Sequence, residues 1–454
     1  MFSVSAKEED VQSFHGHFSL RYLLLAFFSL SLPLSASAAT NVLYLDADGV
    51  SQIAPTATDL TGAITTLNAG WYVTNCSVTN PIAYSNTITI SGDVHLILAD
   101  GCALTVSTGA AGNAGIRVAG ANSLTVYAQS TGAGMGSLAA TGRNGGAGIG
   151  GRTPGETGGT VTINGGTVTA SGNSGLSGST AGAGIGGGGA GDGIAQGGAG
   201  GTVTINGGTV NCIGDSANGF NGAGAGIGGG GGSSGRSGGA GGTITINGGA
   251  VNCIGGNSST GFAGAGIGGG GSGGGSNAYY GVAGTILIYG ESTKVTAQAG
   301  TTSATGVSVA AQDIGAGGGR LAGAAGNVFV ALLPANLQNG SGSIGNAVTF
   351  SASPPSPGTV TAELPAPFST TMDLLTGLTT PRMLSVITTL SSDSVTFELA
   401  DYPPAPKTRA ELMDPNVSVY FFLRGVAQSV PALTPAMLVL LALALGFAGV
   451  RRRS

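Results

Sequence analysis

The sequence predicts an all-β protein built around a right-handed parallel β-helix, a solenoid of stacked coils with glycine-rich loops. Three observations support this fold class. One unit is written four times between Gly146 and Ala299, each copy opens with Gly-Ala-Gly-Ile-Gly-Gly, and each continues into segments in which threonine alternates with valine or isoleucine. A fixed period of this length is typical of stacked repeats rather than of a globular core. The anchor isoleucines, one per copy, lie 42, 41 and 42 residues apart at Ile163, Ile205, Ile246 and Ile288.

Each unit is expected to form three short strands separated by sharp turns. In Thr160–Ile163 the apolar side chains alternate with threonine, so they face the interior while the threonines face solvent. An Asn-Gly-Gly turn follows, and these residues tolerate positive φ. One asparagine per coil would lie in a single column and form a ladder of side-chain amides. The ladder comprises Asn164, Asn206 and Asn247 and ends where Tyr289 takes the asparagine's place.

Composition alone would also fit a low-complexity glycine linker, since 89 of the 454 residues are glycine. The regular Thr-Val-Thr-Ile units favour the β-helix instead. Only 8% of residues are charged and 41% are hydrophobic, whereas disordered chains combine high net charge with low hydrophobicity. The three lysines, Lys7, Lys294 and Lys407, do not form the basic stripe that nucleic acid requires, so we expect no nucleic-acid partner.

The N-terminal region is expected to direct export and then cap the solenoid. Residues 1–38 have the form of a secretory signal peptide, with Arg21 before the apolar run 22–34. Residues 39–69 are expected to form a hairpin or cap around the turn Asp46-Ala-Asp-Gly49. This turn lacks the downstream glutamate of an EF-hand loop, so we expect a turn without metal.

The β-helix repeats are assigned to residues 70–335. Coils near the start span about 26 residues and the later ones about 42, a difference that matches glycine-rich loops added to each later coil. Loops of that length are either functional or mobile. Residues 340–426, in which glycine becomes scarce and prolines cluster, are expected to form a small β module; a loose stalk is the alternative.

Residues 430–454 are expected to be a sorting signal and transmembrane tail. The 21 residues from Val430 to Val450 are long enough to cross a bilayer as a helix. The chain closes with Arg451, Arg452 and Arg453, which would remain cytoplasmic and place the preceding domain outside. An ordinary tail anchor is the alternative.

Several segments resemble a family of large, glycine-rich, adhesin-like β-helix proteins of bacterial surfaces. The resemblance covers roughly residues 41–300 and rests on Gly70-Trp-Tyr-Val73, on residues 90–101 and 123–129, and on the glycine-rich units. The tail is similar to an exosortase-type sorting signal that begins Ile-Pro-Thr-Leu. Here the motif is Val430, Pro431, Ala432 and Leu433. The resemblance implies a Gram-negative host and a sorting protease at the membrane that removes or transfers the tail.

The four cysteines of an exported chain are candidates for disulfides. Cys212 and Cys253 hold the same place in successive repeats, and Cys76 and Cys102 have the appearance of a second stacked pair. Stacked strands lie close enough for a disulfide, but in-register Cβ atoms point the same way, which suits the bond poorly. Disulfides and buried free thiols therefore both remain open.

No catalytic, cofactor or metal site is specified by the sequence. The acids of the repeats occupy unrelated positions and form no carboxylate pair; they are Glu156, Asp192, Asp215, Glu291 and Asp313. His95, the one histidine after the signal, is expected to be structural. We therefore expect no enzyme and no cofactor.

The sequence thus predicts an exported, envelope-anchored protein with a structural or adhesin-like role at the cell surface. The alternative is a β-helix that binds, or less readily cleaves, an extracellular polysaccharide. Aromatic residues gathered on one coil face would favour this alternative. A minor alternative is ice binding through outward threonine pairs, such as Thr160 with Thr162, Thr202 with Thr204, and Thr243 with Thr245.

Overall fold

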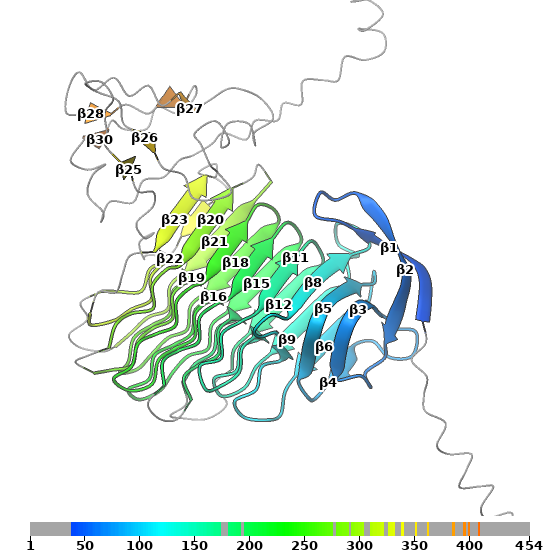
Figure 1. Cartoon of the computed structure of the whole chain (residues 1–454), viewed down its shortest axis with the longest axis horizontal. Helices are drawn as coiled ribbons and strands as arrows, with labels where there is room; N and C mark the ends of the chain where they lie inside the picture. The colour runs from blue at the N-terminus through cyan, green and yellow to red at the C-terminus, as the bar shows by residue number, and fades with distance from the viewer. Residues whose placement is uncertain are drawn as a thin grey trace, which may run out of the picture. The chain divides into compact units, whose positions relative to one another are not determined.

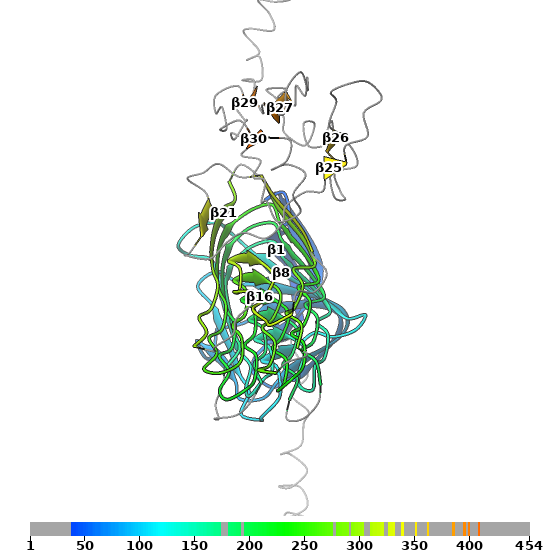
Figure 2. The same cartoon turned by 90° about the vertical axis from the view of Figure 1, so that its left-hand side faces the viewer.

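The computed structural model describes residues 38–173, 180–191, 195–275, 278–289, 292–303, 309–321, 326–331 and 337–339, together with six two-residue strands between 350 and 408. Throughout this described part the regular elements are strands, and they stack into a near-closed solenoid consistent with a parallel β-helix (Figure 1). Figure 2, turned by 90°, shows successive coils lying over one another.

Three parallel ladders make the walls of the solenoid. The first contains the Thr-Val-Thr-Ile segments: β8 (Ser123–Ala128), β11 (Thr160–Ile163), β14 (Thr202–Ile205), β17 (Thr243–Ile246), β20 (Thr285–Tyr289) and β23 (Asn327–Ala331). The second contains β4 (Ile82–Tyr84), β6 (Ala103–Ser107), β9 (Ser137–Thr141), β12 (Thr167–Ser171), β15 (Thr209–Ile213), β18 (Ala250–Ile254), β21 (Lys294–Gln298) and β24 (Leu337–Asn339).

The third ladder is formed by the Gly-Ala-Gly-Ile-Gly-Gly segments and by their counterparts in the coil before them and the coil after them. Its strands are two residues long: β7 (Ile116–Arg117), β10 (Ile149–Gly150), β13 (Ile185–Gly186), β16 (Ile227–Gly228), β19 (Ile267–Gly268) and β22 (Ile314–Gly315). The longer β5 (Ile88–Leu98) joins this ladder to the first, because its start pairs with β7 and its end with β8. The three predicted strands per coil are therefore confirmed.

The core is a set of aliphatic columns inside the solenoid. Val161 and Ile163 are buried while Thr160 is exposed, as the alternation predicts. The register is constant: Ile163 pairs with Ile205, and the column continues through Ile246 and Ile288. Because each coil places the same aliphatic side chain over the last, burial of apolar area stabilises every added coil by a similar amount.

The Asn-Gly-Gly turns follow the prediction in backbone and only partly in side chains. Their second glycines adopt φ of 85° at Gly166, 82° at Gly208 and 78° at Gly249, a region that side chains rarely enter. Asn206 Nδ2 donates to Asn164 Oδ1 over 2.7 Å. The buried Oδ1 of Asn247 has no hydrogen-bond partner among the described residues, so the amide ladder joins the first two coils.

The glycine-rich tracts are packed parts of the solenoid rather than loops that leave it. Gly198 N–H donates to the Gly188 carbonyl, Gly230 to Gly198, Gly239 to Gly230, Gly270 to Gly239, and Gly281 to Gly270, at 2.8–3.0 Å. The outgoing and returning tracts of each coil thus alternate in one continuous zigzag of hydrogen bonds. Figure 1 draws them as nested loops beside the strands.

The N-terminal hairpin is formed by β1 (Ala38–Leu45) and β2 (Ser51–Leu60), which pair antiparallel as predicted. Asp46 closes the turn itself: its carboxylate accepts the Asp48 and Val50 amides and the Gln52 side chain. The end of β2 then pairs parallel with β3 (Thr66–Thr74). β3 already pairs with β5, so the stacked coils begin at Thr66, four residues before the expected Gly70.

Beyond the solenoid, three short antiparallel pairs are described: β25 (Phe350–Ser351) with β26 (Thr361–Ala362), β27 (Leu384–Ser385) with β29 (Glu398–Leu399), and β28 (Ser394–Val395) with β30 (Lys407–Thr408). All six strands lie within residues 340–426, where a small β module or a stalk is expected. Residues 1–37 of the expected signal peptide and the tail 430–454 lie outside the described residues. Among the described residues no helix is long and apolar enough to cross a membrane.

Candidate functional site

Aromatic side chains gather on the outer face of the first coils, beneath the hairpin. Trp71 on β3 and His95 on β5 are register partners and stack with ring centroids 4.4 Å apart. Tyr127 on β8 lies 5.3 Å from Trp71, and Tyr44 of the hairpin packs on both at 4.8 and 4.7 Å. Residues from four strands thus form one aromatic cluster on one coil face.

Polar contacts fix the orientation of His95 within this cluster. Its Nδ1 lies 3.0 Å from the Tyr127 hydroxyl, and its Nε2 lies 3.3 Å from Asp93 Oδ2. Burial raises the pKa of Tyr127 to about 12, with smaller contributions from Tyr44 and Asp93. The hydroxyl therefore keeps its proton at neutral pH. These contacts give His95 a structural place, as the sequence predicts.

A cleft of about 640 Å³ lies between the start of the hairpin and the turns that end β3 and β5. Val42, Val73 and Ala99 give it an apolar wall. Val42 and Val73 also pack in the small core that contains Tyr127, so the aromatic cluster supports the cleft from behind. A volume of this size falls in the range of small-molecule sites.

Most polar groups around the cleft are used to build its walls. The Asn80 side chain donates to the Gly101 carbonyl at 2.9 Å and accepts the Ala103 amide at 3.1 Å. Thr74 Oγ1 accepts the Ala99 amide at 2.8 Å, and Gln129 Oε1 accepts that of Asp100 at 3.1 Å. Because these bonds pin the turns to one another, the cleft is preformed.

Two side chains of the lining point to a ligand. Asp59 on β2 is only 6% exposed and lines the cleft, and among the described residues its carboxylate has no hydrogen-bond or ion-pair partner. Asn41 has φ of 54°, a left-handed conformation that is uncommon outside glycine, and it also lines the cleft. Sequence reasoning missed both residues. The only available signal was an aspartate within the otherwise uncharged segment Ala57–Leu60.

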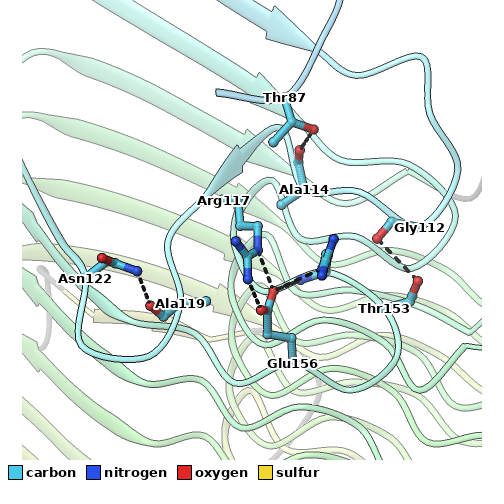
Figure 3. Close-up of polar contacts among 9 residues, drawn as sticks. Thr87, Gly112, Ala114, Arg117, Ala119, Asn122, Thr153 and Glu156 are labelled. Atoms are coloured by element: carbon cyan, nitrogen blue, oxygen red, sulfur yellow. Dashed lines mark hydrogen bonds and ion pairs between the residues drawn. The ribbon is translucent and has the colours of Figure 1, made fainter. Parts of the chain in front are cut away.

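A second cluster joins the third ladder to the first glycine-rich tract (Figure 3). Arg117 on β7 reaches Glu156 through both ends of its guanidinium, with Nε donating to Oε2 at 3.0 Å. The Arg152 amide also donates to Oε2 at 3.1 Å. Burial alone would raise the pKa of Glu156, but the hydrogen bonds from Arg117 and Arg152 outweigh it and hold that pKa below its usual value. The carboxylate is fully occupied by these protein groups.

The other predicted acids do not come together. Asp192 and Glu291 lie outside the described residues. Asp313 is buried, and its Oδ1 accepts the Ala299 amide at 2.7 Å. In earlier coils the equivalent amides of Gly214 and Gly255 donate to a carbonyl of the next coil, so Asp313 replaces that carbonyl. Within the described ranges no group of three or more His, Cys, Asp or Glu residues could hold a metal.

The threonines form two regular columns on the outer side of the first ladder. Thr160, Thr202 and Thr243 pair in one column, and Thr162, Thr204 and Thr245 in the next. The first column is exposed and the second is partly buried. The second column is interrupted at Leu287, which pairs with Thr245.

The cysteines divide into two kinds of pair. Cys76 and Cys102 form a disulfide with a Cα–Cα distance of 5.5 Å, and both line the cleft. Cys212 and Cys253 are register partners on β15 and β18 and are buried free thiols. Burial, followed by the contact with Cys212, raises the pKa of Cys253, so this thiol stays protonated. The in-register pair is therefore the unbridged one. Cys76 and Cys102 lie in turns, where their Cβ atoms can face each other.

No family model, characterised protein or solved structure matches this chain. The sorting residues Val430–Leu433 and Arg451–Arg453 lie outside the described residues.

Proposed function

We propose that the protein is an exported, envelope-anchored repeat protein with a structural or adhesin-like role at the bacterial surface and no catalytic activity. The observation that carries this proposal is the constant register of the solenoid, in which coil after coil repeats the same core and the same outer face. Such a surface suits extended, repeated contact. The solenoid is right-handed, since crossovers between parallel strands nearly always are.

The cellular location in this proposal follows from the segments at the two ends of the sequence. A signal peptide at 1–38 directs export, and the module or stalk at 340–426 connects the solenoid to the tail at 430–454. The apolar run anchors the chain in the inner membrane of a Gram-negative cell, with Arg451–Arg453 in the cytoplasm. The partner at that membrane is a sorting protease of the exosortase type, which recognises Val430–Leu433.

Protease accessibility on intact host cells tests this proposal. We expect an external protease to degrade the solenoid of the full chain before the cells are lysed, while a cytoplasmic marker survives. Replacing Arg451–Arg453 with serine should reduce the exposed fraction, and the substitution Pro431→Ala should leave the tail attached. Protection of the wild-type solenoid until lysis would rule out a surface role.

Glycan binding is the second candidate, and the aromatic cluster favours it. The rings of Trp71 and Tyr127 gather on one coil face and pack against the residues behind a preformed cleft, whose apolar wall and few polar groups suit a small ligand such as a sugar. The partner would be an extracellular polysaccharide. The test is a glycan array probed with the full chain in detergent, with and without a chelator, and a blank array would exclude this candidate.

Ice binding stays a minor candidate, favoured by the two threonine columns. A flat, regular array of hydroxyl and methyl groups is the feature it requires. Ice crystals grown with the full chain should become faceted, and the substitution Thr204→Lys at the centre of the array should abolish the effect. Unaltered crystals with the wild-type chain would eliminate this candidate.

A further inference from the structure

We infer that the cleft beneath the N-terminal hairpin is a saccharide subsite anchored by Asp59, and that it accepts neutral or amino sugars and rejects acidic ones. This inference rests on the glycan-binding candidate above and adds to it a location, an anchoring residue and a substrate class. The aromatic cluster supports the cleft, whereas the ligand contacts come from the hairpin and from the turns that end β3 and β5.

Asp59 carries the argument. Asp59 is only 6% exposed, and carboxylates in such positions are normally paired or hydrogen-bonded within the protein. Here no described residue provides that partner, while the side chain lines a cleft open to solvent. Two adjacent hydroxyl donors of a sugar ring would satisfy both carboxylate oxygens through charge-assisted hydrogen bonds.

The rest of the lining fits a sugar rather than an ion. Sugars present hydroxyl edges and apolar C–H faces, and the cleft offers the matching pair of surfaces. Val42, Val73 and Ala99 form the apolar side, while Asn41 and the free Nε2 donor of Gln129 lie with Asp59 among the polar lining. A volume of about 640 Å³ accommodates one or two sugar rings and greatly exceeds that of a bare cation.

Charge sets the specificity. Asp59 and Asp100 both line the cleft, and no lysine or arginine is among the lining residues. A uronic acid would bring a third carboxylate into this negative field and be repelled, whereas an amino sugar would gain an ion pair. Neutral sugars bind through Asp59 without either effect.

Preorganisation explains why the walls contain so many internal bonds. The Cys76–Cys102 disulfide, the two Asn80 hydrogen bonds and the Gln129 contact hold the turns before any ligand arrives. Binding then costs little ordering of the protein. The left-handed Asn41 stands opposite Pro55, between the register pairs Thr40–Thr56 and Val42–Ala54, and lines the cleft.

The test compares three variants of the full chain on a glycan array, followed by titration with the glycans that bind. The substitution Asp59→Asn keeps the shape and removes the charge, and we expect at least a tenfold loss of affinity for neutral and amino glycans. Asn41→Gly keeps the left-handed backbone and removes the amide, so a severalfold loss is expected at unchanged stability. Asp48→Asn, an equal charge change at the tip of the hairpin, should bind as the wild type does.

The outcomes separate the subsite from the broader proposal. A wild-type chain that binds no glycan removes both. Wild-type binding that Asp59→Asn and Asn41→Gly leave intact places the site elsewhere and overturns the subsite alone, as does a preference for acidic glycans. If Asp59→Asn melts several degrees lower with affinity unchanged, the carboxylate has a structural role only, and the subsite is refuted. If Asp59→Asn does not fold, the Asn41→Gly titration decides.

Discussion

Asparagine occupies the same place in three successive turns, yet its side chain has different surroundings in each. The Asn206 side chain donates to Asn164 Oδ1 in the neighbouring coil. The side-chain Oδ1 of Asn247, by contrast, is buried without a partner in the described part of the chain. Repetition in sequence fixes the position of a side chain but not the bond it makes. The next coil has Tyr289 at this position, so the column has no further amide to continue it.

This difference gives a matched comparison. Asn206→Ala should lower the free energy of unfolding by about 1 kcal/mol, because it removes a hydrogen bond and leaves Asn164 Oδ1 unpaired. Asn247→Ala removes an amide whose oxygen is already unpaired and should cost less. Urea unfolding of both variants measures the difference. An equal loss for the two would show that the amides do not interact.

The Arg117–Glu156 contact predicts that the stability of the fold decreases at acidic pH. The folded-state pKa of Glu156 is lowered, so the unfolded chain binds more protons between that pKa and its ordinary value near 4.5. The carboxylate therefore contributes stability that is complete above pH 4.5 and is lost as the pH falls through the folded-state pKa. Melting temperatures should fall with acidification in that window, and the fall should be smaller in Glu156→Gln. Identical acid profiles would contradict this assignment.

Strands and glycine tracts differ in how far the sequence predicts them. The alternation in Thr160–Ile163 predicts which face of the strand is buried, and the structure confirms this prediction. The glycine tracts have no side-chain pattern, so the sequence left open whether they are mobile or packed. Their packing depends on backbone contact between neighbouring coils: a Cβ at Gly230 would overlap the carbonyl oxygen of Gly188, and one at Gly270 that of Gly230. Glycine is needed there for close approach.

Adding a single methyl group tests whether glycine is needed for the close approach of neighbouring tracts. Gly230→Ala forces two tracts apart and breaks the zigzag of hydrogen bonds, so we expect a loss of about 3 kcal/mol. Gly134→Ala is the control, since a Cβ there meets no atom within 4 Å and no positive φ is required. It should unfold like the wild type. Equal stability of both variants would mean that the tracts are loosely packed.

The candidate cleft was hidden from the sequence for a related reason. Asp59 and Asn41 belong to the hairpin and Gln129 to an early coil, and only the folding of the hairpin onto β3, β5 and β8 brings them together. The sequence predicts only that aromatic residues gathered on one coil face would favour glycan binding. Which residues would gather could not be predicted, because Tyr44 reaches Trp71 through tertiary packing.

At the scale of the whole molecule, the cysteines report the compartment in which the chain folds. The structure has one disulfide, Cys76–Cys102, and two free thiols. Alkylation in denaturant should modify two cysteines without reductant and four after reduction. Reduction should also destabilise the fold by about 3 kcal/mol, since the bond closes a loop of moderate length. Four reactive thiols in the protein isolated from its host, without reductant, would contradict export to an oxidising compartment.

The solenoid is stabilised throughout by contacts between neighbouring coils. In the described part of the glycine-rich coils, each coil packs on the previous one through three ladders and through its glycine-rich tract. A stack of this kind presents fixed columns of side chains to the exterior. A surface role and a preformed cleft both require that rigidity.

Hydrogen–deuterium exchange of the full chain tests this account most directly. Peptides covering the glycine-rich residues 229–242 and 269–275 should exchange as slowly as those covering β11 and β14, because many of their amides, such as those of Gly229, Gly241 and Gly271, donate to neighbouring coils at 2.8–2.9 Å. Complete exchange of the glycine-rich peptides within seconds, with the strands protected, would contradict it, since the tracts would then be mobile loops on a thinner β-helix.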